Sequence, residues 1–218
     1  MMPREGDRER RRERAGKSAS VDAILQAAAL EFEQKGLDGS RIESIARAAG
    51  ISKQMVYHYF ESKDALYSEL AKIVAVRCYS ALLNTDYWAL EPLAAIAAYV
   101  ENAFDQYCEN PLLAAMTEDQ GLHKAQQLRS HPEIENLRRR LSTQIEDALA
   151  RGKKSGAIRS DVSFDRLDFI TATLISKCVW LPGGYAEGIA GETDPMSQEE
   201  WREFAVAFIS AGVCVPRR

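Results

Sequence analysis

One heptapeptide of this 218-residue chain, Lys-Gln-Met-Val-Tyr-His-Tyr, gathers an unusually varied set of reactive side chains. The Lys53 ammonium suits a phosphate oxygen, the Gln54 amide can pair in bidentate fashion with adenine, and Met55 can contact a thymine methyl group. The phenols of Tyr57 and Tyr59 can donate to phosphate oxygens. No catalytic or cofactor chemistry requires this assortment, so the segment favours nucleic-acid binding.

Patterns that mark enzymes and metal sites do not occur in the sequence. It contains three histidines and no GxSxG, HExxH or phosphate-loop motif. Asp119 and His123 stand four residues apart and can share a helix face, but two ligands do not make a metal site. The alternatives for this pair are a polar pocket wall and a solvated helix face. We therefore expect no catalysis, no cofactor and no metal. The alternative function from a different class is that of a helical enzyme.

Cysteine usage and hydropathy indicate a cytoplasmic protein. Cys78, Cys108, Cys178 and Cys214 lie at least thirty residues apart, which favours buried thiols in a reducing compartment over a disulfide framework. The longest uncharged stretch has thirteen residues, too few to cross a bilayer. The N-terminus is charged from Arg4 onward, unlike a secretory signal peptide.

Charge is distributed unevenly along the chain. Residues 1–63 carry 12 Lys and Arg against 10 Asp and Glu, whereas residues 64–218 carry 16 against 22. Seven basic and four acidic residues lie in the first seventeen positions. Such a segment cannot bury apolar surface, so we expect residues 1–17 to form a disordered basic arm. The arm either lies along nucleic acid or stays a solvated tail.

The remaining sequence has a helical period, with about nine helices expected and no strand or hairpin signal. In the first third of the chain, hydroxyl residues mark the helix starts. The expected N-caps are Ser20, Ser40 in a capping box with Glu43, Ser52 and Ser62. The helices that they open run over 20–36, with Gly36 as the stop, 41–49, 53–59, and from 62 onward.

Longer helices are expected over 92–108, 111–123, 132–154, 163–181 and 198–213. A second capping box, Ser197 with Glu200, precedes the last of them. Pro182-Gly183-Gly184 is expected to end the helix over 163–181. That helix carries two apolar faces, one with Leu167, Ile170, Leu174 and Cys178 and the other with Phe169, Thr173, Ser176 and Trp180. The run of three arginines at 138–140 is expected to be a solvated face.

The short elements between residues 20 and 60 have the spacing of a helix-turn-helix, which places the start of its second helix in the major groove. The segment resembles the tetracycline-repressor (TetR) family of bacterial regulators. The resemblance rests on three linked stretches: Ile24-Leu25-x-Ala27-Ala28 with Phe32 and Gly36; Ser40-x-Ile42-x-x-Ile45-Ala46-x-x-Ala49-Gly50-Ile51-Ser52-Lys53; and Val56-Tyr57-His58-Tyr59-Phe60-x-Ser62-Lys63-x-x-Leu66.

The resemblance implies an all-α protein with a helix-turn-helix DNA-binding domain over 18–72 and an effector-binding and dimerisation domain over 73–218. It implies a sequence-specific transcriptional regulator, most often a repressor, that binds a palindromic DNA operator. An activator or an effector-free regulator of the same fold is the alternative. The DNA-binding residues would be Ser40, Arg41, Ser52, Lys53, Gln54, Met55, Tyr57, His58, Tyr59 and Lys63. Gln54 stands where the family often has a small residue, which favours a side-chain contact to a base.

The resemblance also implies a homodimer formed by the last two long helices, about 164–181 and 198–213, and a small-molecule effector bound between helices. The dimer-interface candidates are Phe169, Thr173, Ser176, Trp201, Phe204 and Phe208. The pocket candidates are Trp88, Phe104, Tyr107, Met116, Gln120, His123, Cys178 and Trp180, for which a plain core role is the alternative.

Overall fold

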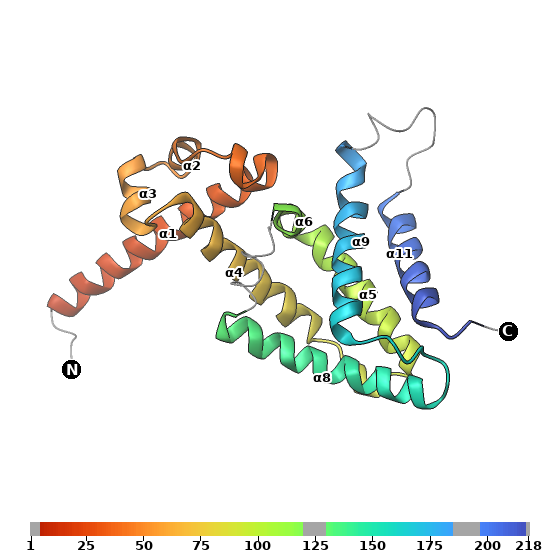
Figure 1. Cartoon of the computed structure of the whole chain (residues 1–218). Helices are drawn as coiled ribbons and strands as arrows, with labels where there is room; N and C mark the ends of the chain where they lie inside the picture. Colours follow the sequence, from red (N-terminus) through yellow and green to blue (C-terminus); the bar gives the residue numbers. More distant parts are fainter. Residues whose placement is uncertain (1–4, 120–129, 185–196, 217–218) are drawn as a thin grey trace. The chain divides into compact units, whose positions relative to one another are not determined.

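The computed structural model of the chain describes residues 5–119, 130–184 and 197–216 (Figure 1). These residues contain nine α-helices and no extended strand, which confirms the all-α class. In chain order, the elements are α1 (Glu5–Gly39), α2 (Ile42–Ala48), α3 (Lys53–Tyr59), α4 (Lys63–Leu82), the 3-10 turn η1 (Tyr87–Ala89), α5 (Pro92–Glu109), α6 (Pro111–Asp119), α8 (Pro132–Lys154), α9 (Phe164–Gly184) and α11 (Gln198–Val213).

The chain divides into two compact units, Met1–Ala71 and Lys72–Arg218, and the boundary falls within α4. In the N-terminal unit, α1 contributes Ile24 and Phe32 to a small core, and both are fully buried. The Phe32 ring meets the edge of Tyr67 on α4, with 5.0 Å between ring centroids. The short helices α2 and α3 add Ile45 and Val56 to this core.

Helix α1 begins earlier than the sequence pattern indicates. It starts at Glu5, so Ser20 lies inside the helix rather than at its N-cap, and residues 5–17 are helical where the composition predicts a disordered arm. Arginine and glutamate are good helix formers, which explains how the helix can extend through this segment. The predicted stop is found at Gly36, whose φ of 63° breaks the helical path.

The C-terminal unit is built from longer helices. Helix α5 packs against α8, α9 and α11, and α9 also packs against α11 and α6 (Figure 1). Its core is rich in aromatic side chains, among them Tyr87, Tyr99, Phe104 and Phe164, all at most 2% exposed. The predicted capping box at the start of α11 is present, with Ser197 and Glu200 bonded reciprocally.

One expectation for α9 is wrong, because the helix continues through Pro182 to Gly184. Pro182 stands two residues before the helix end, so the helix stops close behind the proline.

The first predicted apolar face of α9 is only partly buried. Leu167 and Cys178 are at most 3% exposed, whereas Ile170 is 51% exposed. Asp168, Thr171 and Ile175 are each at most 9% exposed, so polar residues share the buried side of the helix. No helix among the described residues has both the length and the apolar character needed to span a membrane.

Candidate nucleic-acid interface

Helix α3 is anchored by a single side chain. Val56 is fully buried, and it is the one buried residue of the helix. Met55 is 38% exposed and Tyr57 is 44% exposed, although both carry large apolar surfaces. Large apolar side chains that stay accessible on a short polar helix indicate a surface made for contact rather than for packing.

The turn before α3 has the geometry that the sequence predicts. Gly50 takes a φ of 68°, which favours glycine, and the Ile51 N–H donates to the Ala46 carbonyl at 3.0 Å. Ser52 caps α3, because its hydroxyl oxygen accepts the Met55 N–H at 3.2 Å. The turn and the cap together fix where α3 begins.

A cation at the start of α3 forms an ion pair with another residue of the same chain. The Lys53 ammonium, on the first residue of α3, forms an ion pair with the Glu43 carboxylate on α2. It also lies 5.8 Å from the centroid of the Tyr57 ring. The hydrogen bond from Lys53 lowers the pKa of Glu43, and the same bond raises the pKa of Lys53. Both groups are therefore charged at neutral pH.

The start of α2 is held by a carboxylate from α1 rather than by the predicted capping box. The Ser40 hydroxyl donates to the Leu37 carbonyl at 2.7 Å, and Arg41 occupies the N-cap position without a side-chain bond. Glu31 accepts the Arg41 N–H at 3.2 Å and the Lys35 ammonium at 2.8 Å. The predicted box is absent because α2 begins one residue later than expected, with Arg41 at the N-cap, and because Glu43 pairs with Lys53.

Glu31 is a titratable group placed inside this scaffold. It is 8% exposed. Burial raises the pKa of Glu31, but the hydrogen bonds from Lys35 and from the Arg41 N–H outweigh burial and leave the pKa below its ordinary value. The charged carboxylate therefore stabilises the junction of α1 and α2, and sequence reasoning missed it because the contact spans ten residues.

Lys63 binds the end of α1. Its ammonium donates to the carbonyl oxygens of Leu37 at 2.6 Å and Ser40 at 3.1 Å, with Asp38 at 3.4 Å. These carbonyls follow the break at Gly36, near the end of α1. Lys63 thus joins the first residue of α4 to the loop before α2.

The candidate DNA-contact residues differ in accessibility. Those exposed at the surface are Arg41, Ser52, Lys53, Gln54, Met55, Tyr57 and His58. Tyr59 and Lys63 are half-buried, and the Tyr59 ring contacts His58 edge to face at 5.3 Å. Ser40 is 4% exposed, so its side chain belongs to the scaffold of this unit rather than to its surface.

The candidate pocket residues fall into three groups. Phe104, Tyr107, Met116 and Cys178 are buried at 6% exposure or less, on α5, α6 and α9, which pack together. Trp88 is 54% exposed on η1, which places it on the surface instead of in a pocket wall. Gln120, His123 and the Trp180 side chain lie outside the part of the chain that the structure describes.

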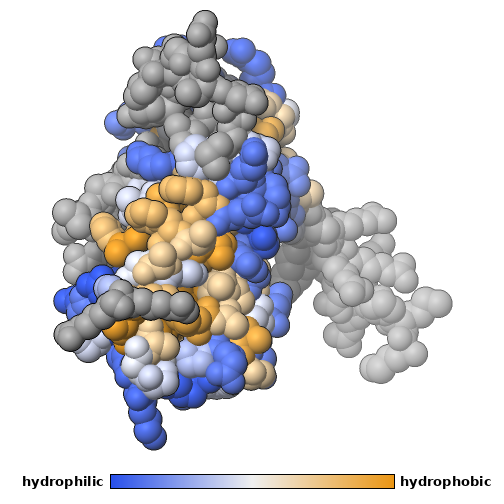
Figure 2. Space-filling model, turned by 90° about the vertical axis from the view of Figure 1, so that its right-hand side faces the viewer, coloured by the Kyte–Doolittle hydropathy of each residue, from blue (hydrophilic) through white to orange (hydrophobic). Residues whose placement is uncertain are grey.

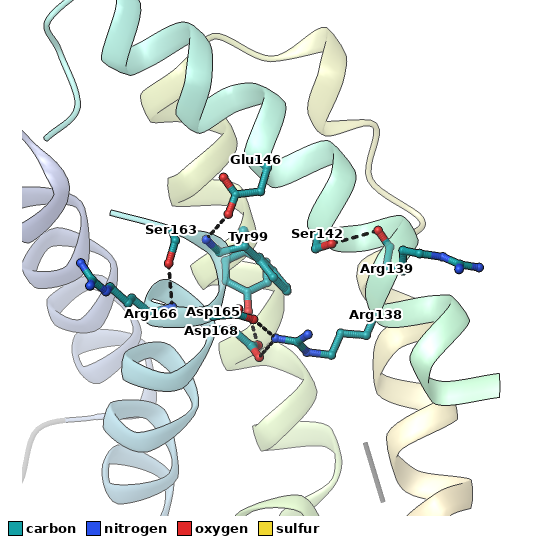
Figure 3. A network of polar contacts seen from close by, with 10 residues as sticks. Tyr99, Arg138, Arg139, Ser142, Glu146, Ser163, Asp165, Arg166 and Asp168 are labelled. Carbon is teal, nitrogen blue, oxygen red and sulfur yellow. Dashed lines mark hydrogen bonds and ion pairs between the residues drawn. The ribbon is translucent and has the colours of Figure 1, made fainter. Parts of the chain in front are cut away.

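A buried polar cluster in the C-terminal unit joins three helices (Figure 3). The Tyr99 hydroxyl on α5 donates to Asp168 on α9 at 2.8 Å. Arg138 on α8 pairs with Asp165 and lies 3.6 Å from the second Asp168 oxygen. Its guanidinium also stacks over Phe164, 5.2 Å from the ring centroid. The expectation of a solvated arginine face is therefore wrong for Arg138, because its partners come from a different helix.

The outer faces of α9 and α11 expose large apolar side chains. Phe169 is 64% exposed, Phe208 is 58% exposed and Phe204 is 44% exposed. Figure 2 shows a band of apolar surface on this side of the molecule. Phe204 stacks on Phe208 at 5.7 Å and meets the edge of the half-buried Trp201 at 5.8 Å.

Thr173 is exposed and lies one turn after Phe169 on α9. Ser176, the remaining candidate for a dimer interface, is fully buried, with its hydroxyl donating to the Thr173 carbonyl at 3.0 Å. A partner chain cannot reach the Ser176 side chain without repacking of the unit. Within the described residues, no group of three or more His, Cys, Asp or Glu side chains is arranged to hold a metal ion.

Two family models match the chain. Residues 24–70 match a model described as "Bacterial regulatory proteins, tetR family". Residues 92–209 match a model described as "Tetracyclin repressor-like, C-terminal domain". The second match alone covers more than half of the chain, and the first covers the helix-turn-helix.

Curated and solved proteins of similar sequence or fold agree with these models. The chain is 24% identical over 153 residues to the transcriptional repressor NicS of Pseudomonas putida, covering 70% of this chain and 72% of NicS. It is 26% identical over 200 residues to the transcriptional repressor KstR2 of Mycolicibacterium smegmatis, covering 88% and 89%. Its fold is similar to that of the regulator FadR from Bacillus subtilis in complex with stearoyl-CoA, with a TM-score of 0.62, 16% identity, and coverage of 88% and 98%.

Proposed function

Because the chain belongs to the TetR family of bacterial regulatory proteins, and is thus a transcriptional regulator, we propose that it is a cytoplasmic, homodimeric repressor that a small molecule releases from its operator. The observation that carries the proposal is α3, a capped helix that buries Val56 alone and leaves Gln54, Met55 and Tyr57 accessible. A helix in this setting can enter a major groove.

We assign base reading to Gln54 and Met55. The first turn of a recognition helix lies deepest in the groove, where an amide can pair with adenine and a thioether can contact a thymine methyl group. Arg41, Tyr57 and Tyr59 flank this turn and suit phosphate oxygens. His58 and Ser52 complete the accessible surface, and the buried Ser40 contributes through the scaffold.

We assign dimerisation to α9 and α11. Phe169 and Thr173 on α9, with Phe204 and Phe208 on α11, form an accessible apolar face that a second copy would cover (Figure 2). Isologous pairing through this face gives a two-fold axis. The DNA site is then a palindrome whose half-sites are about 34–36 Å apart or further.

We assign effector binding to the interior of the C-terminal unit, along α5, α6 and α9. Phe104, Tyr107 and Met116 offer an apolar wall, and the relative solved with stearoyl-CoA supports a ligand with an apolar part. Such a ligand releases DNA only through its differential affinity for two states of the protein. About 5.5 kcal/mol of differential affinity is needed to change a 1:99 population to 99:1.

Fluorescence anisotropy on the whole chain tests this proposal. DNA selected from a random-sequence pool by ligand-stripped protein should bind tightly, and its affinity should fall with rising salt because phosphate contacts release counterions. Replacing the candidate base reader, Gln54→Ala, should cost about 1–3 kcal/mol and relax preference at one base pair. If the selection yields no preferred sequence, the regulator proposal is wrong. If Gln54→Ala leaves the preference intact, the assignment of the base reader is wrong.

A further inference from the structure

The ion pair between Glu43 and Lys53 joins the two helices of the proposed DNA-reading motif. Glu43 lies on α2 and Lys53 is the first residue of α3, ten positions later. Their side chains keep 57% and 49% of their surface accessible, so the pair sits where DNA would approach. An exposed ion pair contributes little to folding stability. We therefore consider what the pair does at the surface that would face DNA.

Lys53 is held from two sides. Glu43 takes its ammonium directly, and the Tyr57 ring lies one turn further along α3, 5.8 Å away from it. A lysine engaged in this way is not a free cation for phosphate. The pKa of Glu43 is lowered and that of Lys53 is raised, mainly by their mutual hydrogen bond, so the pair stays fully charged at neutral pH.

A lysine whose charge is paired within the protein affects the affinity of the protein for DNA of any sequence. On duplex DNA, the logarithm of the binding constant falls linearly with the logarithm of salt concentration. Each lysine that neutralises a phosphate steepens this slope by about 0.9. This contribution is independent of sequence, so it strengthens binding to every competing site. An acidic residue that keeps a lysine occupied removes that contribution.

We propose that Glu43 is a positioning residue that masks Lys53, so that α3 meets non-operator DNA without a phosphate contact from its first residue. This inference rests on the proposed function, because it assumes that α3 faces DNA. It assigns to Glu43 a role in limiting sequence-independent affinity, and it removes Lys53 from the set of phosphate contacts made on non-operator DNA.

The test is the salt dependence of binding to a fluorescein-labelled 30-base-pair duplex of scrambled sequence, measured by anisotropy on the full chain. Glu43→Gln should bind this duplex more tightly than the unmodified chain and should steepen the salt slope by about 0.9 per subunit. That slope corresponds to about 3.5-fold more affinity lost per subunit between 50 and 200 mM salt. Thermal unfolding of each variant establishes that the helices remain folded.

Two further variants separate masking from a general effect of charge. Glu61→Gln removes one carboxylate from an exposed position just after α3, and it should leave the slope unchanged. Lys53→Met should also leave the slope unchanged, since a masked lysine releases no counterion. The double variant Glu43→Gln/Lys53→Met should return the slope to that of the unmodified chain.

The inference is overturned by any of three results. Equal slopes for Glu43→Gln and Glu61→Gln would mean that only net charge matters. A slope reduced by about 0.9 in Lys53→Met would mean that Lys53 contacts phosphate despite Glu43. A steeper slope that persists in the double variant would place the new contact elsewhere. Selective binding to the selected operator by the unmodified chain separates these outcomes from failure of the proposed function, which would overturn both proposals.

Discussion

Two groups of charged side chains, one in each unit, are used in different ways. In the N-terminal unit, Glu31 and Lys63 bind backbone groups at the end of α1 and the start of α2. In the C-terminal unit, Asp168 pairs with Arg138 and accepts the Tyr99 hydroxyl within a core of aromatic side chains. The first arrangement positions short helices, whereas the second joins long ones.

The difference follows from how much each unit can bury. Helices α2 and α3 have seven residues each, and α3 buries Val56 alone, so apolar burial contributes little to holding it in place. Isolated helices of that length are unstable in water. Hydrogen bonds from Glu31 on α1 and Lys63 on α4 help to hold the start of α2 in place. Helices α5 and α8 are long enough to be held by their apolar stripes, and the polar cluster adds contacts between them and α9.

The largest expected effect comes from breaking the buried cluster. Asp168→Ala leaves the Tyr99 hydroxyl and the Arg138 guanidinium without a shared partner, and it should lower the free energy of unfolding by about 3 kcal/mol. Urea unfolding monitored by circular dichroism measures the loss. Asp165→Ala is the matched control, because the Asp165 side chain is 79% exposed and should contribute under about 1 kcal/mol. Similar losses for both variants would contradict a special role for the buried carboxylate.

Close packing at the end of α8 gives the next largest effect. A Cβ added at Gly152 would lie 2.4 Å from Ile158 Cδ1 and 3.1 Å from its Cβ, so Gly152→Ala should cost about 1–3 kcal/mol through overpacking. For a chain of this size, that loss corresponds to a melting temperature lower by about 2–4 °C for each kcal/mol. Gly212→Ala is the control, because its Cβ would meet nothing within 4 Å. A neutral Gly152→Ala would show that Ile158 can move aside.

Glu31 gives the N-terminal unit a pH dependence that the sequence does not reveal. Its pKa is lower in the folded chain than the ordinary 4.5, so its stabilising contribution is present above about pH 4.5 and is lost as pH falls through the lower folded value. Glu31→Gln should cost about 1–2 kcal/mol at pH 7 and should flatten the decline below pH 4.5. Amide hydrogen exchange in residues 18–71 reads this unit separately from the rest. An unchanged pH profile in the variant would assign the decline to other carboxylates.

The smallest expected change comes from Lys63. Lys63→Ala removes the ammonium that donates to the Leu37 and Ser40 carbonyls, and it should lower the local stability of the N-terminal unit by about 1 kcal/mol. Affinity for operator and for scrambled DNA should fall together, because a misplaced α2 disturbs α3 regardless of sequence. Hydrogen exchange and anisotropy on the same samples measure both effects. A loss of affinity with unchanged exchange would point instead to a direct phosphate contact.

Local signals in the sequence determined where most helices lie. Ser52 and Ser197 cap α3 and α11, Gly36 and Gly50 take the backbone conformations that favour glycine, and α3 spans the predicted residues. Each of these features depends on a few consecutive residues. The helix-turn-helix motif could be identified from the sequence for the same reason.

Contacts between helices were decided only by the tertiary structure. The sequence could not show that Glu31 holds the start of α2, that Arg138 reaches Asp168, or that Ser176 is buried and Ile170 is exposed. The positions of these side chains depend on how each helix is rotated about its axis and on which neighbour it meets. Apolar spacing defines a face of a helix only roughly, and polar partners from another helix can change which residues turn inward.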